Sequence, residues 1–207
     1  MTPLPESARR RLFAVFAACA APLVMMLAGC GSDAEAAPNS SVVAEPAESP
    51  VAGAASCPTT PPATAGAPEW TLPGTSGSVA VTGSTDTAAP LVKVEGPFSV
   101  AETQVHTLQA GTGPVVAPTA TVSVCYEGVN GRDGSIFDSS YQRGEPAEFP
   151  LDRVVPGFQK AIAGQTVGST VAVAMSSADG YPDGQPSAGI LPGDTLVFAI
   201  KVLGVTG

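Results

Sequence analysis

Residues 122–164 read VSVCYEGVNGRDGSIFDSSYQRGEPAEFPLDRVVPGFQKAIAG, and this stretch decides how the rest of the chain folds. Its first residues alternate, because Val122, Val124 and Tyr126 fall on one side of an extended backbone. A period of two predicts a half-buried β-strand. Two glycines within residues 130–134 then supply the positive φ angles that a tight turn needs. The stretch therefore predicts a β-strand followed by a tight turn, after which the chain runs back beside that strand.

A short helix closes the stretch. Pro156 suits its first turn, Phe158 and Ile162 share one face, and Gly164 suits its C-terminal cap. A helix of about two turns does not persist alone in water, so we expect it to pack on a sheet. Further strands are expected over residues 104–109, 119–127, 137–139, 147–151, 169–176 and 194–205. Many strands with one short helix predict an α+β fold, with a twisted antiparallel β-sheet wrapped around that helix.

Five separated blocks of the sequence resemble the FKBP-type peptidyl-prolyl cis/trans isomerases. They read YEG, DGSIFDSSYQRGEPAEF, VVPGFQKAIAGQTVGS, ADGY and DTLVFAIKVL, in this order and spacing. The resemblance covers residues 90–207, which we take as the isomerase domain. It implies a ligand pocket between the sheet and the helix, catalysis of X–Pro bond rotation in proline-containing polypeptides, and no cofactor or metal.

The resemblance also implies which residues line that pocket. By position in the matching blocks they are Tyr126, Phe137, Asp138, Val154, Val155, Phe158, Tyr181 and Phe198. The Val155 backbone N–H and the Tyr181 hydroxyl would donate hydrogen bonds to a bound carbonyl. Without the resemblance, the same aromatic residues would fit plain core packing.

Three further residues are implied as substrate contacts. Arg143 is expected to pair with Asp138, Phe149 to contact the substrate, and Ile190 to lie at the pocket rim. Two positions depart from the usual pattern of the family: Ala147 and Phe158 stand where many members carry larger aromatic residues. Both departures are expected to widen the cleft.

Other catalytic chemistries lack their parts. The one histidine, His106, has no partner at a useful spacing and reads as a surface residue. The sequence contains no GxSxG motif, no metal-ligand spacing and no phosphate loop. Prolyl isomerisation needs none of these, because an apolar cleft that excludes water can favour a twisted amide over a planar, more polar one.

Residues 1–29 read as a lipoprotein signal peptide. Three arginines at residues 9–11 precede an apolar, alanine-rich segment at residues 12–28. The segment ends in LAGC, which resembles the lipobox of bacterial lipoproteins and marks Cys30 for lipidation. An ordinary secretory signal is the alternative. The pattern predicts an extracytoplasmic protein, lipid-anchored to the bacterial cell membrane.

Residues 30–89 are rich in Ala, Pro, Ser, Thr and Gly and show no sustained hydrophobic period. Such composition predicts a disordered tether. Trp70 is the exception, for which we favour a solvated loop position over docking on the domain. Cys57 and Cys125 remain available to pair in an oxidising compartment, and the sequence leaves that pairing open.

The charge balance restricts the partners. The chain has 9 Lys and Arg against 18 Asp and Glu, a formal net charge of −9. An acidic chain without a basic run is not expected to bind nucleic acid or anionic lipid headgroups. We expect a monomer that assists the folding of exported proteins as a prolyl isomerase. The alternatives are a non-catalytic peptide-binding or chaperone module on the same fold, and a surface spacer.

Overall fold

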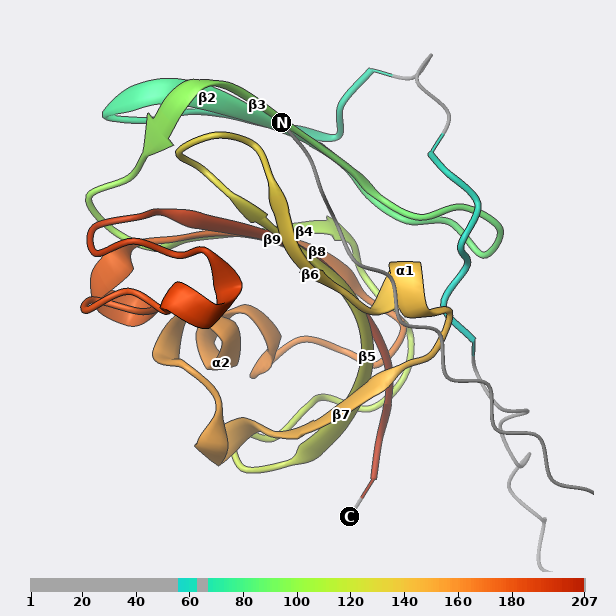
Figure 1. The fold of residues 1–207 in the computed structure, drawn as a ribbon. Coiled ribbons are helices and arrows are strands. Elements are labelled where there is room, and N and C mark those ends of the chain that lie inside the picture. The colour runs from blue at the N-terminus through green and yellow to red at the C-terminus, as the bar shows by residue number, and fades with distance from the viewer. Residues whose placement is uncertain (1–55, 63–66, 207) are drawn as a thin grey trace, which may run out of the picture. The chain divides into compact units, whose positions relative to one another are not determined.

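Two antiparallel β-sheets organise the computed structural model, which describes residues 56–62 and 67–206 (Figure 1). The smaller sheet has the strand order β1-β2-β3, and the larger has the order β4-β8-β9-β5-β6, with β7 also paired to β5. All the described residues belong to one unit of the chain, Glu48–Gly207. The strands are β1 (Trp70–Pro73), β2 (Ser76–Thr82), β3 (Leu91–Ser99), β4 (Gln104–Gln109), β5 (Thr121–Asn130), β6 (Ile136–Ser139), β7 (Ala147–Pro150), β8 (Thr170–Met175) and β9 (Leu196–Val205).

Strand β5 is the hub of the larger sheet, since it pairs with β6, β7 and β9. In its register with β9, Tyr126 lies opposite Ile200. Val122, Val124 and Tyr126 are all buried in one core cluster with helix α2 (Pro156–Ile162). The strand predicted from the period of two is confirmed, although it begins later and runs three residues further, to Asn130.

Helix α2 lies against one face of the larger sheet (Figure 1). Pro156 occupies its first turn, and Gly164, with a φ of 83°, follows its end. Phe158 and Ile162 bury the face that meets the sheet, as expected from their spacing. A second, one-turn helix, α1 (Ser140–Arg143), was not expected; Ser139 caps its start by accepting from the Gln142 N–H. Single 3-10 turns occupy Leu151–Arg153, Ser177–Asp179 and Pro186–Ala188.

The smaller sheet covers the opposite face of the larger one. Val79 and Val81 from β2 pack in one buried cluster with Ala172 and Ala174 from β8 and Ala199 from β9. Small alanine side chains let the two sheets approach closely, and all six residues of β8 are buried. The larger sheet is thus enclosed on both faces, by α2 on one side and by β1–β3 on the other.

This second layer corrects the prediction of a disordered tether over residues 30–89. Strands β1 and β2 both fall within that range. The Trp70 ring is half-buried against the second cluster and stacks on His106, with centroids 5.6 Å apart and planes 6° apart. Docking of Trp70, the less favoured alternative, is therefore correct, while His106 is exposed as predicted. The predicted signal peptide, Cys30 and the tether segments 30–55 and 63–66 lie outside the described residues.

A disulfide ties the segment 56–62, which precedes β1, to the larger sheet. Cys57 and Cys125 are bonded, with their Cα atoms 5.7 Å apart and a sequence separation of 68. Both side chains are buried, and the Cys57 N–H donates to the Gly144 carbonyl at 3.2 Å. Closing a loop of this length stabilises a protein by about 4 kcal/mol in the chain-entropy account.

Candidate active site

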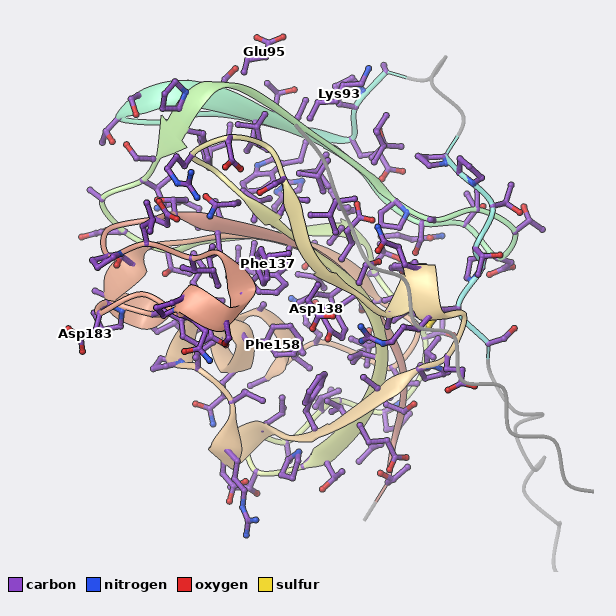
Figure 2. All side chains as sticks on the ribbon, viewed as in Figure 1. Lys93, Glu95, Phe137, Asp138, Phe158 and Asp183 are labelled. Carbon is purple, nitrogen blue, oxygen red and sulfur yellow. A yellow bond between two sulfur atoms is a disulfide. The ribbon has the colours of Figure 1, made fainter. Side chains whose placement is uncertain are left out.

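An apolar cavity of about 430 Å³ opens between α2 and the larger sheet. Figure 2 shows Phe137, Asp138 and Phe158 close together in this region. Ten residues line the cavity: Tyr126, Phe137, Asp138, Phe149, Arg153, Val154, Val155, Phe158, Tyr181 and Phe198. The structure therefore brings together all eight residues implied for the pocket lining, along with Phe149.

Five aromatic rings form the wall of the cavity, each from a different element. Phe158 of α2 meets Phe198 of β9 edge to face, with centroids 5.4 Å apart, and Phe198 meets Phe137 of β6 at 5.5 Å. Tyr126 of β5 and Phe149 of β7 complete the set, at 6.0 and 5.6 Å from the Phe158 ring. Such edge-to-face pairs are the preferred geometry of aromatic side chains. The wall is therefore fixed by packing among its own members.

Gly128 of β5 makes room for two of these rings. A Cβ atom at this position would lie 2.6 Å from Cζ of Phe137 and 2.9 Å from Cε1 of Phe198. Contacts that short do not occur, so a side chain would force the rings apart. The glycine of the YEG block is thus part of the cavity's construction.

Asp138 occupies the polar edge of the cavity, and its carboxylate is already engaged. One oxygen accepts from the Tyr126 hydroxyl, and the other forms an ion pair with Arg143. Arg143 also donates to the Tyr126 hydroxyl, at 3.1 Å, so the three side chains form a closed set. The expected pairing of Arg143 with Asp138 is confirmed, although Arg143 is not part of the cavity lining.

The surroundings shift the pKa values of Tyr126 and Asp138 in opposite directions. Burial, together with the hydrogen bond to Asp138, raises the pKa of Tyr126 to about 12. Burial by itself would raise the pKa of Asp138, but the hydrogen bonds from Tyr126 and Arg143 outweigh it and lower that pKa. Tyr126 is therefore a neutral donor and Asp138 a fixed anion across the neutral range.

Two hydrogen-bond donors of the lining are left free by the rest of the fold. In residues 56–62 and 67–206, neither the Val155 backbone N–H nor the Tyr181 hydroxyl donates to a protein acceptor. Val155 precedes α2, and its carbonyl accepts from the Phe158 and Gln159 N–H groups at 3.0 and 3.2 Å. The donors implied by the sequence are thus available to a ligand.

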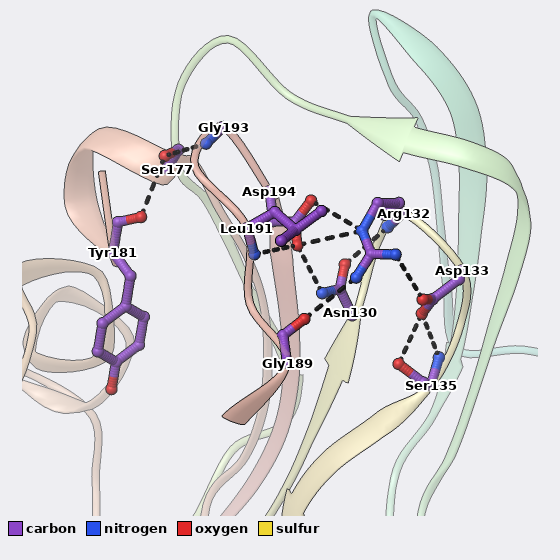
Figure 3. A network of polar contacts seen from close by, with 10 residues as sticks. All are labelled: Asn130, Arg132, Asp133, Ser135, Ser177, Tyr181, Gly189, Leu191, Gly193 and Asp194. Carbon is purple, nitrogen blue, oxygen red and sulfur yellow. Dashed lines mark hydrogen bonds and ion pairs between the residues drawn. The ribbon is translucent and has the colours of Figure 1, made fainter. Parts of the chain in front are cut away.

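The loop that carries Tyr181 is held by polar contacts (Figure 3). The Ser177 hydroxyl donates to the Tyr181 carbonyl at 3.5 Å and accepts from the Gly193 N–H at 3.2 Å. The next residue, Asp194, accepts from the Leu191 N–H at 2.9 Å. The Ser177 hydroxyl thus links the two ends of the 181–194 segment.

Asp194 anchors this loop to the β5–β6 turn. Its side chain is only 6% exposed and accepts from Asn130 at 2.7 Å and from Arg132 at 3.2 Å (Figure 3). Arg132 also donates to the Gly189 carbonyl at 3.1 Å. A buried carboxylate is tolerated when its oxygens are paired in this way. Sequence reasoning missed this cluster, because its members lie in turns more than 50 residues apart.

Two positions differ from the sequence-based site. Ile190 was expected at the rim, but it is 2% exposed and belongs to the main core cluster, so the rim placement is wrong. Its backbone bridges to Gln185 and turns the side chain inward. Arg153 was overlooked, although it directly precedes Val154 and Val155, and it lines the cavity.

The described part of the chain has neither a metal-binding cluster nor a helix that could span a membrane. There, no three His, Cys, Asp or Glu side chains are grouped so as to hold a metal ion. None of the helices described there has the length and apolar character needed to cross a membrane.

Comparison with known proteins identifies the family. Residues 113–203 match the family model of FKBP-type peptidyl-prolyl cis-trans isomerases. An FK506-binding protein of Streptomyces anulatus is 33% identical over 119 residues, which cover 56% of this chain and 96% of the relative. The chain belongs to the FKBP-type peptidyl-prolyl cis-trans isomerase family.

Two other relatives are longer than the matched region. The FKBP-type 22 kDa peptidyl-prolyl cis-trans isomerase of Escherichia coli K12 is 39% identical over 100 residues, 48% of each chain. The outer membrane protein MIP of Legionella longbeachae is 34% identical over 102 residues, 49% of this chain and 43% of the relative. The chain thus spans about half the length of these relatives, and β1–β4 lie outside the family match.

The raised pKa of Tyr126 predicts a measurable titration. Burial also raises the pKa of Tyr141 to about 12, so both tyrosines should remain protonated in the folded protein at pH 11. Because folding raises these values above 10.0, the stability they contribute is present below pH 10 and is lost as pH rises towards 12. Absorbance at 295 nm, followed against pH, checks this. Ionisation of all three tyrosines by pH 11 in protein that is still folded would contradict it.

Proposed function

We propose that this protein is a peptidyl-prolyl cis/trans isomerase that acts on proline-containing polypeptides. The observation that carries the proposal is the cavity, whose wall is five packed aromatic rings and whose lining holds two free donors, Val155 N–H and Tyr181 hydroxyl. Membership of the FKBP-type family supports it. The mechanism follows from what such a cavity does to an amide.

Rotation about an X–Pro bond is slow because amide resonance must be broken, which costs about 18–20 kcal/mol. The planar amide is the more polar form, and the twisted transition state has lost part of its charge separation. A cavity that replaces water with aromatic carbon destabilises the planar form more than the twisted one. The aromatic wall formed by Phe137, Phe158 and Phe198 supplies that environment without a nucleophile.

The polar groups then orient the substrate. The Val155 N–H and the Tyr181 hydroxyl hold substrate carbonyls, which fixes the peptide while the bond turns. Asp138 contributes a fixed negative charge at the cavity edge, because Arg143 and Tyr126 occupy both of its oxygens. No step transfers a proton, so no general acid or base is involved.

The role of Tyr181 gives a direct test. Tyr181→Phe keeps the ring and removes one hydrogen bond of about 1 kcal/mol, so kcat/KM for a proline peptide should fall about fivefold. Tyr141→Phe is the matched control, since it loses a hydrogen bond to Ser84 away from the cavity. A protease-coupled or NMR exchange assay measures both variants, and the rate of the unchanged protein should be nearly flat between pH 6 and 8.

The outcomes separate the candidate functions. Equal losses in the two variants would contradict the role of the Tyr181 hydroxyl, and a steep dependence of rate on pH would contradict the desolvation mechanism. Peptide binding without any turnover would instead indicate the non-catalytic peptide-binding module.

We also propose that the protein works outside the cytoplasm and is anchored by lipid on Cys30, with residues 1–29 removed as a signal peptide. The LAGC sequence at residues 27–30 supports this. The buried Cys57–Cys125 disulfide supports an oxidising compartment, since such bonds are rare in the cytosol. A relative named as an outer membrane protein supports an envelope location. Its substrates would then be exported proteins that are still folding. The protein would act on them as a monomer.

The anchor proposal predicts a change in fractionation. Cys30→Ser removes the acceptor thiol, so the protein should leave the membrane fraction or accumulate as unprocessed precursor. Two acyl chains give nearly permanent attachment, so the shift should be almost complete. Cys19→Ser, within the signal, is the control and should change nothing. Mature, membrane-bound Cys30→Ser protein would show that the lipobox interpretation is wrong.

A further inference from the structure

Asp138 and Arg153 are the only charged residues that line the cavity within the described part of the chain. They are not equivalent. Both oxygens of Asp138 are occupied, one by the Tyr126 hydroxyl and the other by Arg143, so this carboxylate already has a charged partner. Arg153 forms no ion pair and no side-chain hydrogen bond with residues 56–62 and 67–206. Arg153 is therefore the one charged residue of the lining that has no partner in the described part of the chain.

Arg153 is the one arginine of the described part that is not paired with a carboxylate. The protein has a formal net charge of −9, and the other two arginines of the described part are paired with carboxylates. Lys160, the nearest lysine in sequence, is likewise paired, with Asp179 at 2.7 Å. An acidic protein that leaves an arginine unpaired at its site offers that side chain to a ligand.

The position of Arg153 determines what it can reach. It ends the 3-10 turn Leu151–Arg153 and is followed by Val154 and Val155, so it adjoins the residue whose N–H is free to hold a substrate carbonyl. A proline in the aromatic cavity would place its flanking residues at this edge. The arginine guanidinium is planar and matches a carboxylate with two parallel hydrogen bonds.

We propose that Arg153 is a specificity-determining residue that binds a substrate carboxylate, so that the enzyme favours prolines with Asp or Glu as an immediate neighbour. The inference rests on the proposed isomerase function of the same cavity and names its substrate class. Arg153 is exposed, and an ion pair with an exposed arginine changes affinity by about 1.5- to 5-fold. Added salt screens such a pair, so the preference should shrink at high ionic strength.

The test compares peptides within each variant of the full chain, kept in mild detergent, by NMR exchange. One arm places Glu, Gln or Lys before the proline, and the other places the same residues after it. In the unchanged protein, one arm should show kcat/KM about 1.5- to 5-fold higher for Glu than for Gln, mainly through KM. The arm in which Glu raises kcat/KM shows whether Arg153 binds a carboxylate before or after the proline.

Charge substitutions then assign the preference to Arg153. In Arg153→Gln, the ratio of kcat/KM for Glu peptides to that for Gln peptides should fall to about one. In Arg153→Glu, Glu peptides should become worse substrates than Gln peptides, and Lys peptides better ones. Any general change in activity cancels in these ratios. Lys93→Gln removes another unpaired cation, on β3 and away from the cavity, and should keep the ratio of the unchanged protein. A ratio near one in the unchanged protein, or a ratio unaffected by Arg153→Glu, overturns the proposal.

Failure of the isomerase function gives a different result. If no peptide is turned over, the same peptides are titrated and binding is followed by NMR shifts. Glu peptides that bind more tightly than Gln peptides, with the order reversed in Arg153→Glu, support the carboxylate site without catalysis. Equal affinities overturn the carboxylate site as well.

Discussion

Burial of both faces of strands β8 and β9 is the constraint on which the rest of the structure depends. Every residue of β8 is buried, and the two strands pair over six positions. Val171 and Val173 face the core with α2, whereas Ala172 and Ala174 face β2. A sheet that excludes water on both sides holds its strands in one register. The aromatic residues that it carries are therefore held in one arrangement.

The cavity depends on this rigid frame. Its rings come from four strands and one helix, so a shift of any element would open a gap in the wall. A mechanism that works by excluding water needs this continuity more than it needs any single reactive group. The polar cluster around Asp194 extends the same control to the loop that carries Tyr181. Packing supplies the wall, and hydrogen bonds within and below the 181–194 loop hold the segment that carries Tyr181.

The sequence predicted the family-like half of the fold well. Strand β4 has the expected bounds, and α2 begins at the expected proline. The aromatic lining could be predicted because its residues sit in several blocks with fixed spacing. The placement of Ile190 failed because a bridge within its loop turns the side chain inward, which spacing alone does not reveal.

The second layer could not be recognised from its own composition. Val79 and Val81 alternate over a few residues only, within a segment rich in Ala, Thr, Gly and Pro. The signal lay in the partner strand, where Ala172 and Ala174 are small and apolar at positions that would be polar on a solvated face. A continuous apolar strand indicates burial on both sides. The disulfide was likewise left open, because Cys57 lies in the range expected to be a disordered tether, whereas the structure buries it beside Cys125.

Native-state hydrogen exchange in the full chain tests most directly whether residues 70–99 are a layer of the same domain. The amides of β2, which pairs with both β1 and β3, should exchange only through global unfolding, with protection close to that of β8 and β9. Cooperative loss of protection in all of these strands with added denaturant is the predicted result. Exchange of β2 at the rate of an unstructured peptide, while β8 and β9 remain protected, would contradict the account.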